Sequence, residues 1–243
     1  MRPAPLAPEA LLDIWERGSA RHLFDQALLI LQRACPAETH ESLSGLTIGQ
    51  RDALLLLVRA QTFGDRMESY VECPSCMERL EFTLSCETLL ADAAYSGPRQ
   101  KKFACAGVEW ELRAPTSRDL AVVALASESE AVDALLTCCV TPASASTDLL
   151  VQWTDSLRAT LAAELASLDP QAEIRIELTC PACKHIWHSV FDITAFLSKE
   201  IPAHSRRLLQ EVDVLARRYG WAESDVLRMS GTRRRFYVQM ALS

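Results

Sequence analysis

Two copies of the motif Cys-Pro-x-Cys constrain the fold of this chain more than any other feature. They are Cys73-Pro74-Ser75-Cys76 and Cys180-Pro181-Ala182-Cys183. Together they supply four thiolates, which is the complete ligand set of a tetrahedral structural zinc site. Because 103 residues lie between Cys76 and Cys180, one shared metal would tie the middle of the chain to its last third.

The spacing within each pair suits a metal. Two intervening residues let both sulfurs face one ion, and a bound zinc lowers the pKa of the thiols and holds them as thiolates. We therefore predict one structural zinc per chain, with four ligands: Cys73, Cys76, Cys180 and Cys183.

Two alternatives to this shared site stay open from the sequence alone. Each pair could form a local disulfide or a turn without metal. The pairs could also be two separate half-sites that other side chains complete, with Cys86, His185 and His188 as candidates. The remaining cysteines are predicted to be buried apolar residues, namely Cys35, Cys105, Cys138 and Cys139.

The motifs give no support to catalysis. A catalytic zinc keeps an open position and usually includes His, Asp or Glu, whereas four cysteines close the shell. A thioredoxin-like Cys-x-x-Cys begins a helix after a strand, whereas strand-like segments flank both pairs here. The sequence also lacks a glycine-rich phosphate loop, GxSxG and HExxH. We expect no enzyme and no small-molecule substrate.

Composition narrows the class of protein further. The net charge is −7 over 243 residues, which argues against a nucleic-acid binder, since such proteins usually carry a basic excess. The longest apolar run, 120–126, is far shorter than the roughly 20 residues of a membrane span. Nine cysteines without a recognisable signal peptide predict a reducing compartment, the cytoplasm.

Hydrophobic periodicity predicts an α+β fold that is mostly helical. Helical spacing covers 8–34 with a break at Gly18, the stretch from 48 to about 63, 148–168 and most of the chain after 193. Apolar residues alternate with polar ones over 80–84 and 174–178, as in half-buried strands. Each Cys-Pro-x-Cys therefore lies in an antiparallel β-hairpin, and together the hairpins carry a split zinc-ribbon-like site.

The long stretch between Cys76 and Cys180 also predicts the domain organisation. Ordinary zinc ribbons have far shorter spacers, so a helical and hairpin insertion at about 91–172 should separate the two halves. We expect an N-terminal helical segment over 1–46 and a single zinc-linked domain over 47–243. Residues 35–46 and 141–147 are predicted to be irregular, because Pro, Gly and Ser are frequent in them.

Two blocks of sequence carry a family resemblance. The first contains Ile48-Gly49-Gln50-Arg51-Asp52, then Thr62-Phe63-Gly64-Asp65-Arg66 and the first motif. The second runs from the other motif through His185, Trp187 and Phe191-Asp192-Ile193 to Tyr219-Gly220-Trp221. Together they resemble the baseplate hub assembly chaperone family of contractile-tailed phages, whose relatives also occur in phage-tail-like contractile injection systems.

This resemblance covers roughly 11–90 and 175–240, and it implies a structural role. Such a protein would help to build the baseplate hub or form part of it. Its partners would be other baseplate, hub or tube proteins. It would act in the cytoplasm during assembly or as part of the particle. The resemblance assigns a role only to the four cysteines, as metal ligands, and it implies no catalytic residue.

Two other functions compete with this reading. Zinc ribbons often bind nucleic acid, and Arg233-Arg234-Arg235 could serve a regulator of that kind. The overall acidity opposes it, as do Glu72 and Glu78 beside the first motif. A thiol-dependent enzyme that uses one cysteine pair is the remaining alternative.

Overall fold

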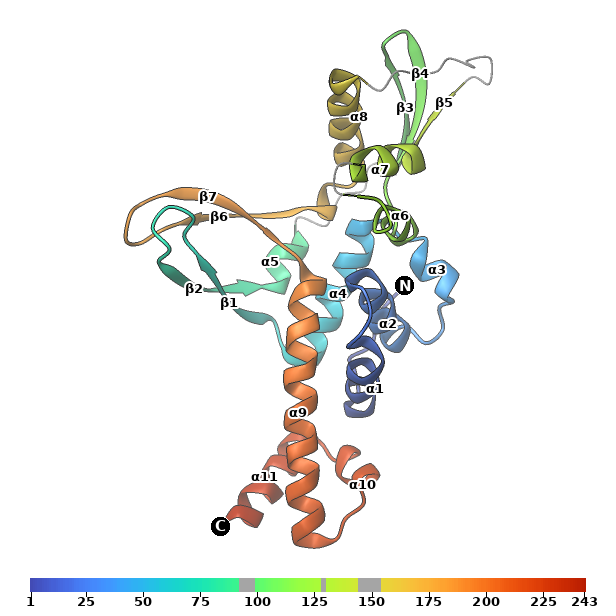
Figure 1. Cartoon of the computed structure of the whole chain (residues 1–243). Helices are drawn as coiled ribbons and strands as arrows, with labels where there is room; N and C mark the ends of the chain where they lie inside the picture. Colours follow the sequence, from blue (N-terminus) through green and yellow to red (C-terminus); the bar gives the residue numbers. More distant parts are fainter. Residues whose placement is uncertain (92–98, 128–129, 144–153) are drawn as a thin grey trace.

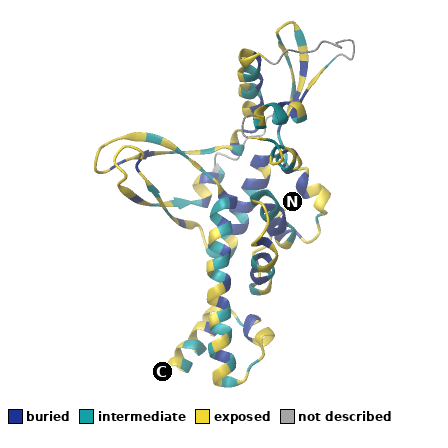
Figure 2. Ribbon diagram, in the orientation of Figure 1, coloured by how far each residue is buried: buried dark blue, intermediate teal, exposed yellow. Residues whose placement is uncertain are grey.

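A helical body forms the centre of the molecule. The computed structural model describes residues 1–91, 99–127, 130–143 and 154–243. The body contains α1 (Pro8–Gly18), α2 (Leu23–Ala34), α4 (Ile48–Phe63) and the N-terminal half of α9 (Ile193–Tyr219) (Figure 1). Apolar side chains from all four helices bury one another in the largest core of the described part of the chain (Figure 2). Residues before 47 therefore share their core with α4 and α9.

Local sequence chemistry sets the ends of these helices. The Thr47 hydroxyl accepts a hydrogen bond from the Gln50 N–H, and the Gln50 side chain accepts one from the Thr47 N–H, which completes the expected capping box of α4. Gly64 ends α4 with a φ of 96°, a value that glycine adopts readily.

One predicted loop contains a helix. We expected 35–46 to be irregular, but α3 (His40–Ser44) forms within it. The Thr39 hydroxyl accepts a hydrogen bond from the Ser42 N–H at 3.1 Å and caps this short helix. The prediction was wrong here because Leu43 is fully buried against the body, a contact that local sequence does not show.

Two β-hairpins leave the body on the same side (Figure 1). Strands β1 (Arg66–Glu72) and β2 (Arg79–Ser85) form the first, which α5 (Cys86–Ala91) follows. Strands β6 (Ile174–Thr179) and β7 (Ile186–Phe191) form the second, after a short 3-10 helix η1 (Pro170–Ala172). Both pairs are antiparallel and two-stranded. These hairpins on a mainly helical chain confirm the predicted fold class.

The residues between the hairpins build a second packed unit. It holds a three-stranded sheet in the order β3 (Gln100–Cys105), β4 (Val108–Arg113), β5 (Val140–Pro142), with helices α6 (Ser117–Val123), α7 (Ala131–Cys139) and α8 (Asp155–Leu168). Its core is a separate cluster that includes Trp110, Leu112, Leu136 and Leu161.

Two boundaries in this unit differ from expectation. We predicted that 141–147 is irregular, but β5 covers 140–142, because Val140 is buried and pairs with Leu112. We predicted that the next helix begins at 148, but Thr154 is the N-cap of α8 and its hydroxyl accepts a hydrogen bond from the Leu157 N–H. Residues 144–153, which include the rest of the predicted irregular stretch and the predicted start of the helix, lie outside the described residues.

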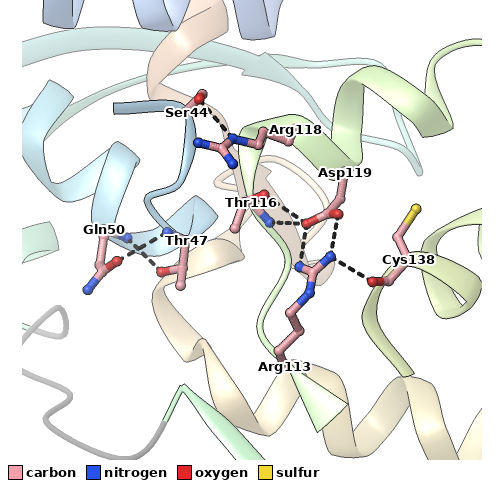
Figure 3. A network of polar contacts seen from close by, with 8 residues as sticks. All are labelled: Ser44, Thr47, Gln50, Arg113, Thr116, Arg118, Asp119 and Cys138. Atoms are coloured by element: carbon pink, nitrogen blue, oxygen red, sulfur yellow. Dashed lines mark hydrogen bonds and ion pairs between the residues drawn. The ribbon is translucent and has the colours of Figure 1, made fainter. Parts of the chain in front are cut away.

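Two helix caps meet where this unit joins the body (Figure 3). Thr47 and Thr116 form an isolated antiparallel bridge. Thr116 donates to Asp119 through its N–H and its hydroxyl, both at 2.8 Å, and Arg113 binds Asp119 through two nitrogens at 2.7 Å each. Burial alone would raise the pKa of Asp119, but these hydrogen bonds lower it below its ordinary value. The joint therefore depends on an ionised carboxylate.

The C-terminal part folds back on the free end of α9 (Figure 1). After Gly220, which has a left-handed φ of 69°, come α10 (Glu223–Leu227) and α11 (Gly231–Leu242). Arg234 is buried and its Nε donates to Glu211 at 2.5 Å, whereas Arg233 and Arg235 are exposed. The arginine run is therefore not one continuous basic face. No described helix is long and apolar enough to cross a membrane.

Candidate metal centre

The four predicted cysteines meet where the ends of the two hairpins come together. Their Sγ atoms all lie within 4.8 Å of one another. The Sγ atoms of Cys73 and Cys183 are 3.7 Å apart, and those of Cys76 and Cys180 are 3.6 Å apart. A tetrahedral zinc with Zn–S bonds of about 2.3 Å places its sulfurs roughly 3.8 Å apart. The cluster therefore has the dimensions of such a site.

Both cysteine pairs use the same backbone turn. In the first, the Cys73 N–H donates to the Glu78 carbonyl and the Met77 N–H donates to the Cys73 carbonyl, each at 2.9 Å. The second repeats this with Cys180, His185 and Lys184, at 2.9 and 3.0 Å. The residue after each second cysteine is left-handed, with a φ of 60° at Met77 and 61° at Lys184. Two equivalent knuckles thus present their sulfurs to one point.

The cluster is half inside the protein. Cys73 and Cys180 are fully buried and form a small apolar cluster with Leu80. The partly buried side chains of Val71 and Trp187 pack against this cluster. Cys76 and Cys183, the second cysteine of each pair, are exposed. An ion held by all four would therefore be shielded on one side by this small apolar cluster and accessible to solvent on the other.

The thiols of the two exposed cysteines have opposite pKa shifts. The His185 backbone N–H lowers the pKa of Cys183 to about 7, with help from the neighbouring thiols. The Glu78 backbone N–H also lowers the pKa of Cys76, but hydrogen bonding to the thiols of Cys183, Cys180 and Cys73, together with desolvation, raises it to about 12. The hydrogen bonds within the cluster therefore favour one thiolate among these thiols, and the thiolate is the form that binds metal.

The structure leaves the other candidate ligands outside this cluster. Within the described residues, the four cysteines are the one group of three or more His, Cys, Asp or Glu side chains arranged to hold a metal. Cys86 is buried in the core of the helical body. The His185 ring stacks on Trp187 at 5.8 Å, and His188 Nε2 lies 3.7 Å from Glu177. None of the nine cysteines forms a disulfide.

The expected burial of the remaining cysteines is partly met. Cys35 and Cys139 are buried, whereas Cys105 and Cys138 are half-buried beside the core of the inserted unit. Burial raises the pKa of Cys139 to about 12, so this thiol is neutral at physiological pH.

Sequence reasoning missed one residue that positions the second hairpin. The buried Asp169 carboxylate accepts hydrogen bonds from the Gly49 N–H and from Arg99, each at 2.7 Å. It thereby connects the first turn of α4 to the segment that leads into β6. In the sequence, the Asp169-Pro170 dipeptide indicates only the end of a helix. The residues that bind the Asp169 carboxylate, Gly49 and Arg99, lie 120 and 70 positions away.

Comparison with known proteins gives the family. A family model described as T4 bacteriophage base plate protein matches residues 20–198. This range includes both knuckles and the beginning of α9. No curated protein and no solved structure matches the chain. Because the match spans well over half of the 243 residues, this chain belongs to the T4 bacteriophage base plate protein family.

Proposed function

We propose that Cys73, Cys76, Cys180 and Cys183 bind one structural zinc per chain. The distances between their sulfurs support this, since they fit the tetrahedral geometry of a four-thiolate site. The zinc would connect the far ends of two hairpins that are more than 100 residues apart in the sequence. Four thiolates leave no open position for substrate, so the metal would act on folding and shape.

We also propose that the protein is a non-enzymatic assembly factor or structural component of the baseplate hub. The observation that carries this proposal is the family match across both knuckles, α2 and α4. The resemblance of the two motif blocks to hub assembly chaperones supports the hub in particular. Its partners would be other baseplate, hub or tube proteins of a contractile phage tail or contractile injection system. They would meet it in the cytoplasm during assembly.

The domain division is part of the same proposal. Described residues between 103 and 168 have a core of their own, which supports treating 91–172 as an insertion into the zinc-linked domain over 47–243. Residues 1–46 would be the helical segment that precedes it. Limited proteolysis checks the division: cleavage within 91–172 should leave the two hairpins joined through the metal.

Metal analysis tests the zinc. Protein purified without chelator should contain about one zinc per chain. Cys73→Ser and Cys180→Ser should each lose it, because each removes one of four ligands. Cys105→Ser, outside the cluster, is the control that should keep it. Loss of zinc in only one of the two ligand variants would refute a shared site.

Gene deletion tests the role. A strain without this gene should make tubes and sheaths that lack a complete baseplate hub, and the gene supplied in trans should restore it. Mass spectrometry of purified particles then separates a subunit that stays from a factor that leaves. Normal, functional particles from the deletion strain would overturn the proposed role.

A further inference from the structure

The four cysteines of the metal centre differ in their access to solvent. Cys73 and Cys180, the first cysteine of each pair, are fully buried, whereas Cys76 and Cys183 are exposed. The other five cysteines of the chain are buried or half-buried. Because oxidation of cysteine follows exposure, a small oxidant in solvent reaches the sulfurs of Cys76 and Cys183 first.

Each exposed sulfur contacts a buried sulfur of the other hairpin. The Sγ atom of Cys183 lies 3.7 Å from that of Cys73, and the Sγ atom of Cys76 lies 3.6 Å from that of Cys180. A disulfide bond is about 2.05 Å long, so an approach of roughly 1.6 Å within each contact would form the bond. Both contacts run from one hairpin to the other.

The two contacts are equivalent to one another. Both knuckles have the same backbone hydrogen bonds and the same left-handed residue after their second cysteine. In each contact, the exposed second cysteine of one knuckle meets the buried first cysteine of the other. The second contact is therefore arranged for the same reaction as the first.

We propose that hydrogen peroxide converts this centre into two disulfides between the hairpins, Cys73–Cys183 and Cys76–Cys180. The modification goes beyond the proposed function. It rests on the proposed zinc site only in that the metal is released as its ligands are consumed.

The reaction balances with two molecules of peroxide. The exposed Cys183 thiolate attacks a peroxide oxygen, the O–O bond breaks, and a sulfenic acid and a hydroxide ion form. The Cys73 thiolate then attacks the sulfenic sulfur, the S–S bond forms, and a second hydroxide ion leaves. Cys76 and Cys180 react in the same way. Four thiolates thus give four electrons to two peroxide molecules, and four protons from solvent convert the hydroxide ions to water.

The pairing decides what oxidation does to the fold. Disulfides within the knuckles, Cys73–Cys76 and Cys180–Cys183, would leave the hairpin ends without a link once the metal is gone. The proposed pairs put two covalent links in place of the metal. A baseplate protein in a particle outside the reducing cytoplasm, where disulfides persist, would keep its hairpins joined in this way.

Peptide mapping of the zinc-loaded protein tests the pairing without any variant. The protein is treated with hydrogen peroxide, the remaining thiols are blocked with N-ethylmaleimide under denaturing conditions, and trypsin is added without a reductant. Because of the Arg and Lys residues around the knuckles, trypsin releases each knuckle in one peptide, 67–79 or 176–184. Mass spectrometry then separates peptides that are joined from peptides with an internal disulfide.

The expected product is one species in which two disulfides join the two peptides. Fragmentation of this species should assign Cys73 to Cys183 and Cys76 to Cys180. A metal-sensitive dye should report about one zinc released for every four thiols lost, since all four ligands are consumed. Cys105→Ser should give the same product as the parent protein, because Cys105 lies outside the cluster.

Oxidation in urea with a chelator is the matched control. In the unfolded chain, loop-closure entropy favours cysteines with two residues between them over cysteines more than 100 residues apart. Each peptide should then carry its own internal disulfide. Joined peptides from the folded protein and separate ones from urea would show that the fold selects the partner of each sulfur.

Several results would overturn the inference. They are internal disulfides in the folded protein, joined peptides with any other assignment, sulfinic or sulfonic acids in place of disulfides, and reaction at the other five cysteines while these four stay reduced. A protein purified without zinc would refute the proposed metal site. Mapping of that metal-free protein would still support or overturn the pairing, so the two failures are distinguishable.

Discussion

The backbone N–H of Gly49 donates to the carboxylate of Asp169 at 2.7 Å, across 120 positions of sequence. The two residues are so close that Gly49 has no room for a side chain. A Cβ there would press on the Asp169 carboxylate and come within 2.8 Å of the Gln171 Cβ. This contact fixes the first turn of α4 against the segment that leads into the second hairpin.

Gly49→Ala should therefore lower the free energy of unfolding by about 2 kcal/mol, a typical effect of overpacking. Urea denaturation monitored by circular dichroism measures the change. Gly231→Ala is the control, because its Cβ would meet only the end of the Arg234 side chain at 3.9 Å. Equal stability of the two variants would show that the contact yields without strain.

Chelation of the proposed zinc should loosen the hairpins and leave the body folded. The core of the body contains neither Cys73 nor Cys180, which pack in a small cluster of their own, and isolated two-stranded hairpins are barely stable in water. Hydrogen exchange should speed up over 66–85 and 174–191 after chelation, whereas amides of α2 and α4 should keep their protection. Loss of protection in all these elements would mean that the metal supports the whole fold.

Glycine at the left-handed knuckle positions should stabilise the protein. Met77 and Lys184 have φ values of 60° and 61°, a conformation that costs most L-residues about 1–2 kcal/mol and glycine almost nothing. Met77→Gly and Lys184→Gly should each raise the free energy of unfolding of the zinc-bound protein by about 1 kcal/mol. Glu78→Gly, at an ordinary φ, should lower it, and a loss of stability in all three would contradict the argument.

The stability of the protein should fall on mild acidification, in part through His204. Its ring stacks on Phe63 at 4.3 Å. Burial lowers the pKa of His204, and the positive charges of Arg207 and Arg59 add to this effect, whereas Glu200 opposes it. The unfolded chain then binds the proton more readily than the folded one, so stability declines as pH falls below about 6.5 toward the lower folded pKa.

The variant His204→Phe keeps the stacked ring and removes the titrating group. The loss of stability between pH 7.5 and pH 5.5 should be smaller in this variant than in the parent protein, as measured by urea denaturation at both values. Any release of zinc by acid affects both proteins alike, so the difference between them reports His204. An identical pH dependence would show that this group does not contribute.

Local sequence was sufficient for many of the elements. Thr47 and Gln50 predict their own capping box, and alternation over 80–84 and 174–178 predicts the strands beside each knuckle. The four cysteines predict a shared cluster, since sulfur ligands must converge to bind one metal, but the structure was needed to choose this cluster over local disulfides or two half-sites. Each of these features depends on interactions among neighbouring residues or on the number of ligands that zinc requires.

Only the tertiary structure decided the rest. Residues 140–142 form a strand because β4 lies beside them, and residues 40–44 form a helix where Leu43 is buried against the body. The contact between Gly49 and Asp169, and the lining of one cleft by residues of both β1 and β7, each join segments about 120 residues apart. Which surfaces meet is determined by the packing of the whole chain, and a short window of sequence does not contain that information.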